Sequence, residues 1–218
     1  MKYHKISSVY KRHRDGKDIG KFNGEFVDDY VETLYGCDYP FAWTEKLDGT
    51  NIRLEIEDGK FKLGGRTDRA QIPVPLLDFV RDNDVDLKMI DKFIGDKSFD
   101  GSVTVFGEGV GAKIQKGGGM YGDHRIIVFD VAMQFADGNV WWLERDAVEG
   151  IAKDLGLEVA EEYGVGPLRY AEDAVSGIGL ISEHGEGRAE GLVCRPEPGI
   201  RTRRGDRIIF KVKTIDYQ

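Results

Sequence analysis

The chain has 218 residues, of which 40% are hydrophobic and 32% are charged, and its formal net charge is −8. These values are typical of a globular protein long enough to bury a core, and no apolar run is long enough to span a membrane. A protein that binds nucleic acid through its overall charge would be basic, so this class is excluded and any polyanion must meet a local basic surface.

The elements predicted along the chain are mostly short strands. A hairpin is predicted over 50–65, because alternating apolar residues flank an Asp58-Gly59 turn. Further strands are predicted over 102–108, 124–135, 139–143, 190–196 and 206–214. Helical periodicity predicts helices over 74–94, 143–156 and 169–179. The strands are too closely spaced for repeated βαβ units, so we expect an α+β fold of antiparallel sheets with helices on their outer faces.

Three features concern location and partners. The first residues lack the apolar stretch of a signal peptide, and Cys37 and Cys194 have no metal-ligand spacing, which predicts free thiols in a reducing, cytoplasmic compartment. Two segments are locally basic, "KRHRDGKDIGK" at 11–21 and "RTRRGDR" at 201–207. Each is either a solvated loop or a contact for a polyanion. The glycine-rich segment 107–122 is predicted to be a shaped loop.

The stretch "EKLDGTNIR" at 45–53 has two interpretations. It is either a surface hairpin or a turn that presents Lys46 as a nucleophile. A lysine attacks only when uncharged, and its reference pKa is about 10.4, so a nucleophilic site must disfavour the ammonium ion through burial or nearby cations. Lys211 and Lys213 alternate on one strand and therefore share a face, which is costly unless that face is wet or an anion lies there.

The order of the short motifs decides between these interpretations. The chain contains "EKLDGTN", "GGRT", "FGEG", "VFDV", "EGLV" and "FKVK" in that order. This series resembles the covalent nucleotidyltransferases, the superfamily of polynucleotide ligases and capping enzymes. Asn51, five residues after Lys46, is similar to the RNA ligase 2 and RNA-editing ligase family. Asp48 is more typical of DNA ligases, which leaves the sugar preference of the substrate open.

The resemblance implies an ATP-grasp-like ligase adenylation domain over 1–218, a nucleotidyltransferase fold, with Lys46 forming a lysyl-AMP intermediate from ATP. AMP would then pass to a 5′-phosphate and be displaced by a 3′-hydroxyl, on RNA or a nicked duplex, with Mg²⁺ or Mn²⁺ present. The implied catalytic residues are Lys46, Glu190, Lys211 and Lys213. The implied nucleotide-binding residues are Glu45, Asn51, Arg66, Glu108 and Phe129. The implied metal-binding residues are Asp48, Glu108 and Glu190.

Nucleic-acid contacts are expected at two places. Lys113 and Lys116 lie in the glycine-rich loop that follows Glu108. The arginine cluster, defined as Arg201, Arg203, Arg204 and Arg207, lies in sequence between the strand after Glu190 and the strand of Lys211. That position predicts that the cluster emerges close to the active site.

Several alternatives remain open. A minimal DNA ligase and a non-catalytic protein that binds nucleic-acid ends fit many of the same residues, whereas Asn51 disfavours a GTP-dependent capping enzyme. We expect no OB-fold and no C-terminal helical domain, so the chain is either a minimal enzyme or a fragment. A monomer that repairs or seals nicked RNA, of phage-like origin, is the expectation that the resemblance suggests.

Overall fold

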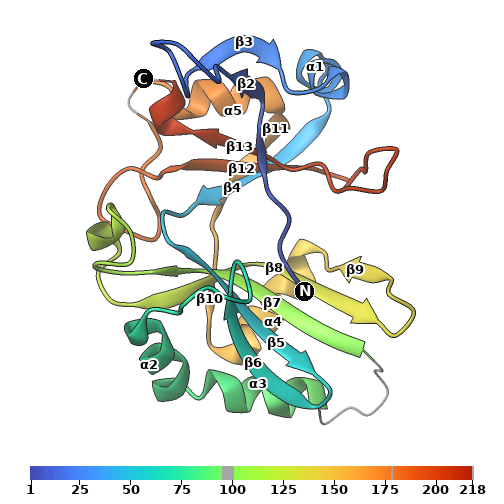
Figure 1. The fold of residues 1–218 in the computed structure, drawn as a ribbon, viewed down its shortest axis with the longest axis vertical. Coiled ribbons are helices and arrows are strands. Elements are labelled where there is room, and N and C mark those ends of the chain that lie inside the picture. The colour runs from blue at the N-terminus through green and yellow to red at the C-terminus, as the bar shows by residue number, and fades with distance from the viewer. Residues whose placement is uncertain (95–100, 178, 218) are drawn as a thin grey trace. The chain divides into compact units, whose positions relative to one another are not determined.

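The computed structural model describes residues 1–94, 101–177 and 179–217. These residues form two compact units, each assembled from segments that are distant in sequence. The first unit comprises Met1–Tyr3 and Asp48–Ala160, and the second comprises His4–Leu47 and Glu161–Gln218. Both units combine β-sheet with helices (Figure 1), which confirms the predicted α+β class.

The first unit is built on one large sheet. Within the described residues its strand order is β10-β8-β7-β5-β6, and β9 pairs with β8. The strands are β5 (Thr50–Glu57), β6 (Lys60–Gly65), β7 (Gly101–Val110), β8 (Arg125–Phe135), β9 (Val140–Trp142) and β10 (Glu158–Val159). Most pairs are antiparallel as predicted, but β10 pairs with β8 in parallel. A 3-10 turn, η1 (Gly118–Tyr121), lies between β7 and β8.

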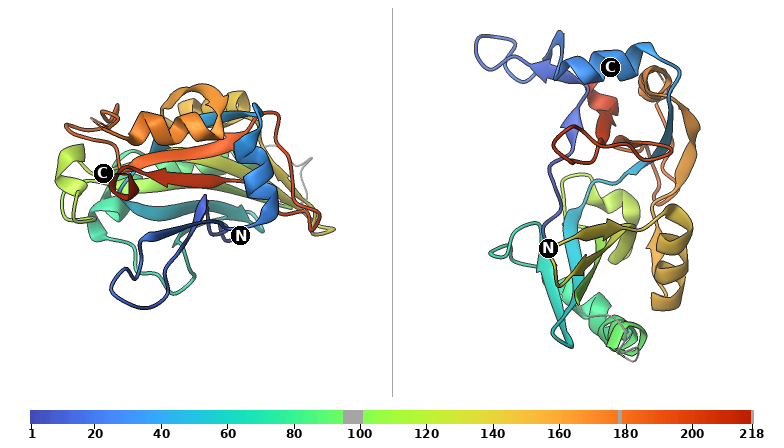
Figure 2. Two further views of the ribbon diagram at one scale, coloured as in Figure 1. Left: turned by 90° about the horizontal axis from the view of Figure 1, so that it is seen from above. Right: turned by 90° about the vertical axis from the view of Figure 1, so that its right-hand side faces the viewer.

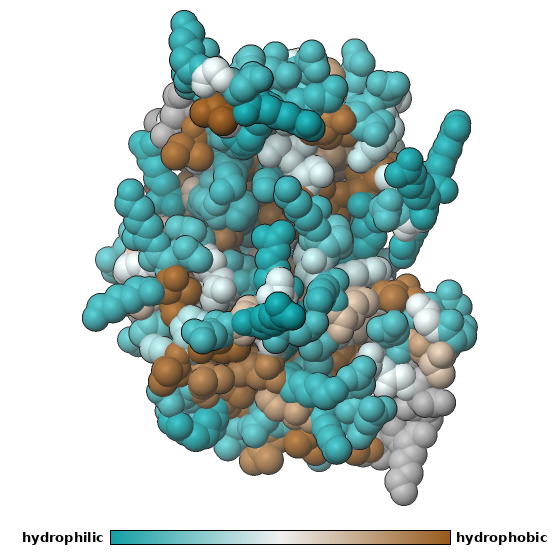
Figure 3. Space-filling model, in the orientation of Figure 1, coloured by the Kyte–Doolittle hydropathy of each residue, from teal (hydrophilic) through white to brown (hydrophobic). Residues whose placement is uncertain are grey.

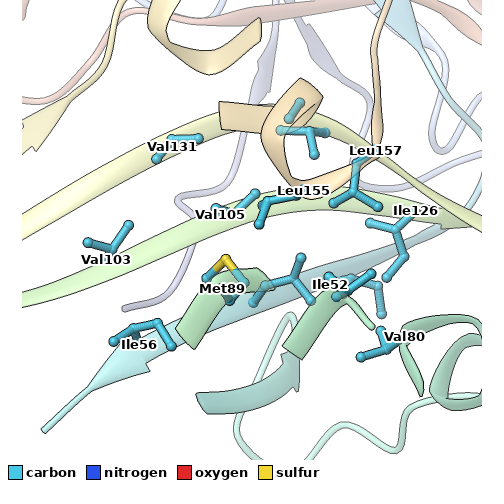
Figure 4. Packing of buried hydrophobic residues seen from close by; sticks show 14 of the residues in the cluster. Ile52, Ile56, Val80, Met89, Val103, Val105, Ile126, Val131, Leu155 and Leu157 are labelled. Carbon is cyan, nitrogen blue, oxygen red and sulfur yellow. The ribbon is translucent and has the colours of Figure 1, made fainter. Parts of the chain in front are cut away.

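Helices cover one face of this sheet and create the core of the first unit. They are α2 (Val74–Asp82), α3 (Val85–Ile94) and α4 (Arg145–Leu155). Figure 4 shows side chains of Ile52 and Ile56 from β5 beside Met89 of α3, with Val105 of β7 near Leu155. Because successive strand residues point to opposite faces, this packing directs Asn51 and Glu108 to the other face. Figure 2 shows α4 on one side of the sheet and the N-terminus on the other.

Two local predictions can be compared with the first unit. The hairpin over 50–65 is confirmed, with Asp58 and Gly59 both at positive φ, as a tight two-residue turn requires. The single helix predicted over 74–94 is wrong, because the chain breaks into α2 and α3 at Asp84, whose φ is +53°. The break allows Leu76 and Val80 of α2, and Val85 and Met89 of α3, to be buried separately.

The second unit contains a five-stranded sheet with the order β1-β13-β12-β4-β11 in the part of the chain described. Its strands are β1 (Ser7–Ser8), β4 (Pro40–Lys46), β11 (Glu162–Pro167), β12 (Gly191–Pro196) and β13 (Phe210–Lys213). The pairs of β12 with β4 and β13 are antiparallel, whereas β1 joins β13 in parallel. β13 is shorter than the predicted 206–214, since Arg207 forms only an isolated bridge with Arg201. A 3-10 turn, η2 (Thr214–Asp216), follows β13.

A small hairpin and two helices complete the second unit. The hairpin consists of β2 (Tyr10–Arg12) and β3 (Phe22–Phe26), and the helices are α1 (Asp29–Gly36) and α5 (Leu168–Val175). α5 overlaps the helix predicted over 169–179 but begins one residue earlier and ends at Val175, and residue 178 is outside the described residues. The core of this unit gathers Phe41, Leu168, Leu192 and Phe210.

The stretch 45–53 is not a surface hairpin. β4 ends at Lys46 and pairs with β12 and β11, whereas β5 begins at Thr50 and pairs with β6 and β7. The two strands therefore belong to different sheets and different units. The interpretation of the stretch as a hairpin is wrong, and Lys46 is the last residue of a central sheet strand.

The visible surface is largely hydrophilic. Figure 3 shows hydrophobic atoms gathered over the region where Figure 1 places α2, and Val74 and Leu77 of that helix are exposed. No helix in the described residues is both long enough and apolar enough to cross a membrane.

Candidate active site

Lys46, Glu190 and Lys213 form a bridged cluster in the second unit. Gly191 of β12 is in register with Lys46 of β4 on one side and with Lys213 of β13 on the other, so the three positions form one row across three strands. Glu190 precedes Gly191. Its Oε2 accepts a hydrogen bond from Lys46 Nζ at 2.5 Å, and its Oε1 lies 2.5 Å from Lys213 Nζ. One carboxylate thus holds two ammonium groups whose side chains are 20% and 30% exposed.

Glycine at position 191 allows this close arrangement. Its φ is +153°, and a Cβ there would lie 2.0 Å from the carbonyl oxygen of Val212. Any other residue would push β13 away from β12. The preceding carbonyl, that of Glu190, accepts a hydrogen bond from Thr214 N at 2.9 Å. These backbone constraints fix Glu190 between the two lysines.

Lys211 adds a third ammonium group to the same strand as Lys213. Burial lowers the pKa of Lys211, and the positive charges of Lys213 and Lys46, followed by those of Lys5 and Arg12, lower it further. Alternation along β13 places Lys211 and Lys213 on one face, as predicted from the sequence. Among the described residues, Glu190 is the one carboxylate that pairs with Lys46 and Lys213, so this end of the sheet is arranged to receive an anion.

Glu45, the residue before Lys46, is almost completely buried at 3% exposure. Its Oε1 accepts a hydrogen bond from Ser182 Oγ at 2.5 Å, and its Oε2 accepts one from the backbone N–H of Glu183 at 3.0 Å. The Tyr163 hydroxyl also lies 3.1 Å from Oε2, and burial together with the charge of Glu45 raises the pKa of Tyr163. Glu45 therefore fixes the loop before β12 to the end of β4.

The partners of Glu45 were not predicted from the sequence. Ser182 and Tyr163 lie in segments with no recognisable motif, and only the buried carboxylate gives them a role. A buried acidic residue requires hydrogen-bond donors, so the position of Glu45 inside an apolar strand was the one available signal. The prediction that Glu45 supports the adenine side of the site stays a prediction.

In the first unit, Asp48, Asn51 and Glu108 lie at one end of β5 and β7. Asn51 is the register partner of Glu108. A Cβ at Gly49 would lie 2.3 Å from the carbonyl oxygen of Gly109 and 2.8 Å from Glu108 Cγ, so only glycine permits this approach. The Asp48 N–H donates to the Tyr121 hydroxyl at 2.8 Å. These contacts bring three predicted residues together within this unit.

Asn51 carries a further indication of a binding site. Its Oδ1 is buried and has no hydrogen-bond partner in the part of the chain that the structure describes. Buried polar atoms almost always have a partner, so an unpaired one indicates a group that a ligand or water satisfies. A role for Asn51 in nucleotide binding stays a prediction, which this unpaired oxygen atom favours.

Phe129 lies in an aromatic cluster of the first unit. It contacts Tyr3 edge to face at a centroid distance of 5.1 Å and lies roughly parallel to Phe106 at 6.5 Å. It is also the extra residue of a bulge, since Phe106 pairs with Asp130 and Gly107 with Val128. A bulge redirects a side chain relative to its neighbours, and Phe129 is only partly buried. Stacking on adenine stays a prediction that this partial exposure permits.

The remaining predicted residues lie on exposed loops. Arg66 directly follows β6 and is exposed, as are Lys113 and Lys116. Of the arginine cluster, Arg207 is partly buried and the other three members are exposed. The loop leaves β12 after Pro196 and enters β13 at Phe210, whereas Gly191 and Lys213 lie at the opposite end of these strands (Figure 1).

The loop of the arginine cluster therefore leaves β12 and β13 at the end opposite Lys46, Glu190 and Lys213, and not beside these residues as expected, although Lys211 directly follows Phe210. Five residue steps separate Gly191 from Pro196, and at about 3.3 Å per residue the two ends of β12 lie roughly 16 Å apart. Closeness in sequence did not predict closeness in space, because the loop joins the antiparallel strands β12 and β13 at one end, whereas Lys46, Glu190 and Lys213 lie at the other end. A role for the cluster in nucleic-acid binding stays a prediction.

The predicted metal residues do not form a ready-made centre within the described residues. No group of three or more His, Cys, Asp or Glu side chains there could hold a metal ion. Both oxygens of Glu190 are engaged by lysines, and Asp48 and Glu108 belong to the first unit. Mg²⁺ usually binds through one or two carboxylates together with water and substrate phosphates, so Asp48 and Glu108 still fit such an ion.

Comparison with known proteins decides the family. The sequence matches the RNA ligase family over residues 39–213, a range that contains all the predicted catalytic residues. The chain belongs to the RNA ligase family. No relative was found among curated protein sequences. This RNA ligase family member shares its fold with solved structures of an RNA ligase from Naegleria gruberi.

Three of these structures illustrate the similarity. A mutant of the Naegleria enzyme with ATP and Mn is 18% identical with a TM-score of 0.62, and the match covers 98% of this chain and 61% of the other. A mutant with AMP and Mn is 17% identical with a TM-score of 0.60, covering 97% and 62%. The enzyme with PPi is 19% identical with a TM-score of 0.62, covering 99% and 62%. The chain thus spans about three fifths of the length of these relatives.

Proposed function

We propose that the chain is an ATP-dependent RNA ligase that works through a lysyl-AMP intermediate. The observation that carries the proposal is the cluster of Lys46, Glu190 and Lys213, in which a lysine at the end of a central strand shares a carboxylate with a second lysine. Family membership and the ATP-bound and AMP-bound forms of the Naegleria enzyme support the choice of nucleotide.

In the first step, Lys46 Nζ attacks the α-phosphorus of ATP. A nitrogen–phosphorus bond forms while the bond from the α-phosphorus to the pyrophosphate oxygen breaks, and pyrophosphate leaves with its electron pair. Lys46 must release a proton for this attack, and Glu190, hydrogen-bonded to Nζ, is placed to accept it. Lys211 and Lys213 then stabilise the negative charge on the α-phosphate.

In the later steps, AMP passes from Lys46 to a 5′-phosphate, and a 3′-hydroxyl then displaces AMP to form the phosphodiester. Each step is a displacement at phosphorus, so catalysis rests on positioning and on stabilising charge. Asn51, Glu108, Phe129 and Arg66 would bind the nucleotide or the 5′-phosphate end. Asp48 and Glu108 would hold a Mg²⁺ or Mn²⁺ ion, which supplies charge neutralisation at the phosphates.

The biological setting is part of the proposal. We infer a monomer that repairs broken or nicked RNA in a cytoplasm. The cytoplasmic location is supported by Cys37 and Cys194, which are free thiols, as expected in a reducing compartment. A phage-encoded enzyme acting in its host's cytoplasm is the origin that the sequence resemblance suggests. Asp48 keeps a minimal DNA ligase as the second candidate, because aspartate at this position resembles DNA ligases.

The test is transfer of label from ATP to protein. Wild type and Lys46→Ala are incubated with ATP labelled at the α-phosphate and Mg²⁺, and then separated under denaturing conditions. We expect label on wild type alone, whereas label on neither protein overturns the ligase proposal and favours a protein that only binds nucleic-acid ends. A parallel incubation with labelled GTP tests the choice of nucleotide.

A second assay addresses the sugar. Nicked duplexes that differ only in having RNA or DNA on the 3′-hydroxyl side are offered to the adenylated protein. Faster sealing of the RNA nick is expected. Equal or faster sealing of the DNA nick would replace the RNA ligase assignment with the DNA ligase alternative.

A further inference from the structure

A basic groove lies in the second unit beside Lys211. Its volume is about 1000 Å³, and its wall is formed by residues 5–8, by the β2–β3 hairpin with its connecting loop, and by Lys211 itself. The hairpin contains the segment "KRHRDGKDIGK", to which the proposed chemistry gives no role. Figure 2 shows its loop (dark blue) projecting from the rest of its unit.

The lining of this groove is strongly cationic in a chain of net charge −8. The basic residues that line it are Lys5, Lys11, Arg12, Arg14 and Lys211, together with His13, and the acidic ones are Asp15 and Glu25. A local excess of this kind concentrates positive potential in a concave, partly desolvated surface. It is the local basic surface that an acidic protein needs in order to bind a polyanion.

The cations of the groove divide into fixed and available groups. Arg12 is held by Asp216 at 2.5 and 2.9 Å and by the Gly20 carbonyl at 2.7 Å, and its guanidinium lies 4.4 Å from the centre of the Phe22 ring. This anchoring shapes the hairpin. Lys11 pairs with Glu25 at 3.2 Å, where both side chains are largely exposed. Lys5 and Arg14 are exposed and form no ion pair with another described residue, so their charges are available to a ligand.

We propose that this groove binds the phosphodiester backbone of the polynucleotide and guides it to Lys211. The inference rests on the proposed function for the identity of the polyanion. Lys211 lines the groove and also belongs to the strand of Lys213, so a bound strand would lead towards the proposed catalytic lysines. The volume of the groove is near the upper end of the range for small-molecule sites. This is more space than the triphosphate of one ATP requires, so the groove fits a backbone of several nucleotides better.

Neutralising the available cations tests this role. Lys5→Ala/Arg14→Ala is compared with wild type for binding of a short fluorescein-labelled single-stranded RNA, measured by anisotropy without ATP at several salt concentrations. Two lost phosphate contacts lower the steepness of log Kd against log salt by about 1.4 and weaken binding roughly tenfold at moderate salt. Thermal unfolding of the double variant verifies that it folds.

The matched control is Lys60→Ala/Lys153→Ala, which removes the same charge from exposed positions of the first unit. If the control weakens binding as much as the groove variant, only net charge matters and the proposal is overturned. Unchanged RNA binding by the groove variant, with a higher KM for ATP in self-adenylation, would assign the groove to the triphosphate and also overturn it. Because RNA binding is measured without ATP, failure of self-adenylation in wild type is a separate result that concerns only the proposed function.

Discussion

Replacing Glu45 by alanine tests whether this buried carboxylate holds the end of β4 against the loop before β12. Glu45 is 3% exposed and accepts hydrogen bonds from Ser182 Oγ and the Glu183 N–H. Hydrogen bonds to a charged group contribute about 1.5–3 kcal/mol each, and the exposed backbone of Glu183 can recover part of its bond from water. We therefore expect Glu45→Ala to lower the free energy of unfolding by about 3 kcal/mol.

The assay is urea unfolding followed by tryptophan fluorescence, with Trp43 of β4 reporting on the second unit. Glu45→Gln keeps one acceptor oxygen and is expected to lose about half as much stability. Glu57→Ala, at an exposed ion pair with Lys62, is the control and is expected to change little. If Glu45→Ala unfolds at the same urea concentration as wild type, Glu45 does not organise this end of the sheet.

Two other substitutions probe β12 and β13. Gly191→Ala places a Cβ 2.0 Å from the Val212 carbonyl oxygen, so we expect it to lower the free energy of unfolding by roughly 3 kcal/mol or more and to abolish adenylation. Gly199→Ala is the neutral control, because a Cβ there would meet no atom within 4 Å. Thermal unfolding and labelling with ATP compare the two variants. Burial lowers the pKa of Lys211 below 10.5, so its positive charge destabilises the folded state at neutral pH. As pH rises from the lowered pKa towards 10.5, the folded state loses this proton before the unfolded state does, and the free energy of unfolding therefore increases. Lys211→Met should therefore unfold at higher urea than wild type near neutral pH, with an advantage that shrinks as pH approaches 10.5; a constant or growing advantage would contradict this origin.

Local patterns allowed much of the fold to be predicted. The hairpin around Asp58-Gly59 and helix α4 were predictable because alternation, turn chemistry and the terminal Gly156 are all short-range signals. The break between α2 and α3 depends on Asp84 adopting a left-handed conformation. Aspartate tolerates that conformation better than most residues, but nothing in the local sequence requires it.

Sheet membership was harder to predict. β4 and β5 are separated by only three residues yet belong to different sheets, because pairing is decided by which distant strands complete each core. The same limit applies to the candidate site. The motif order predicted Lys46, Glu190 and Lys213, whose ion pairs the structure then shows, but the anchoring of Glu45 by Ser182 depends on contacts 137 residues apart.

The location of the covalent nucleotide tests the central claim most directly. The protein is incubated with ATP and Mg²⁺, digested under conditions that preserve phosphoramidates, and its peptides are sequenced by mass spectrometry. We predict AMP on the side-chain nitrogen of Lys46. AMP on another residue, or none on any peptide while the protein remains folded, would contradict the account.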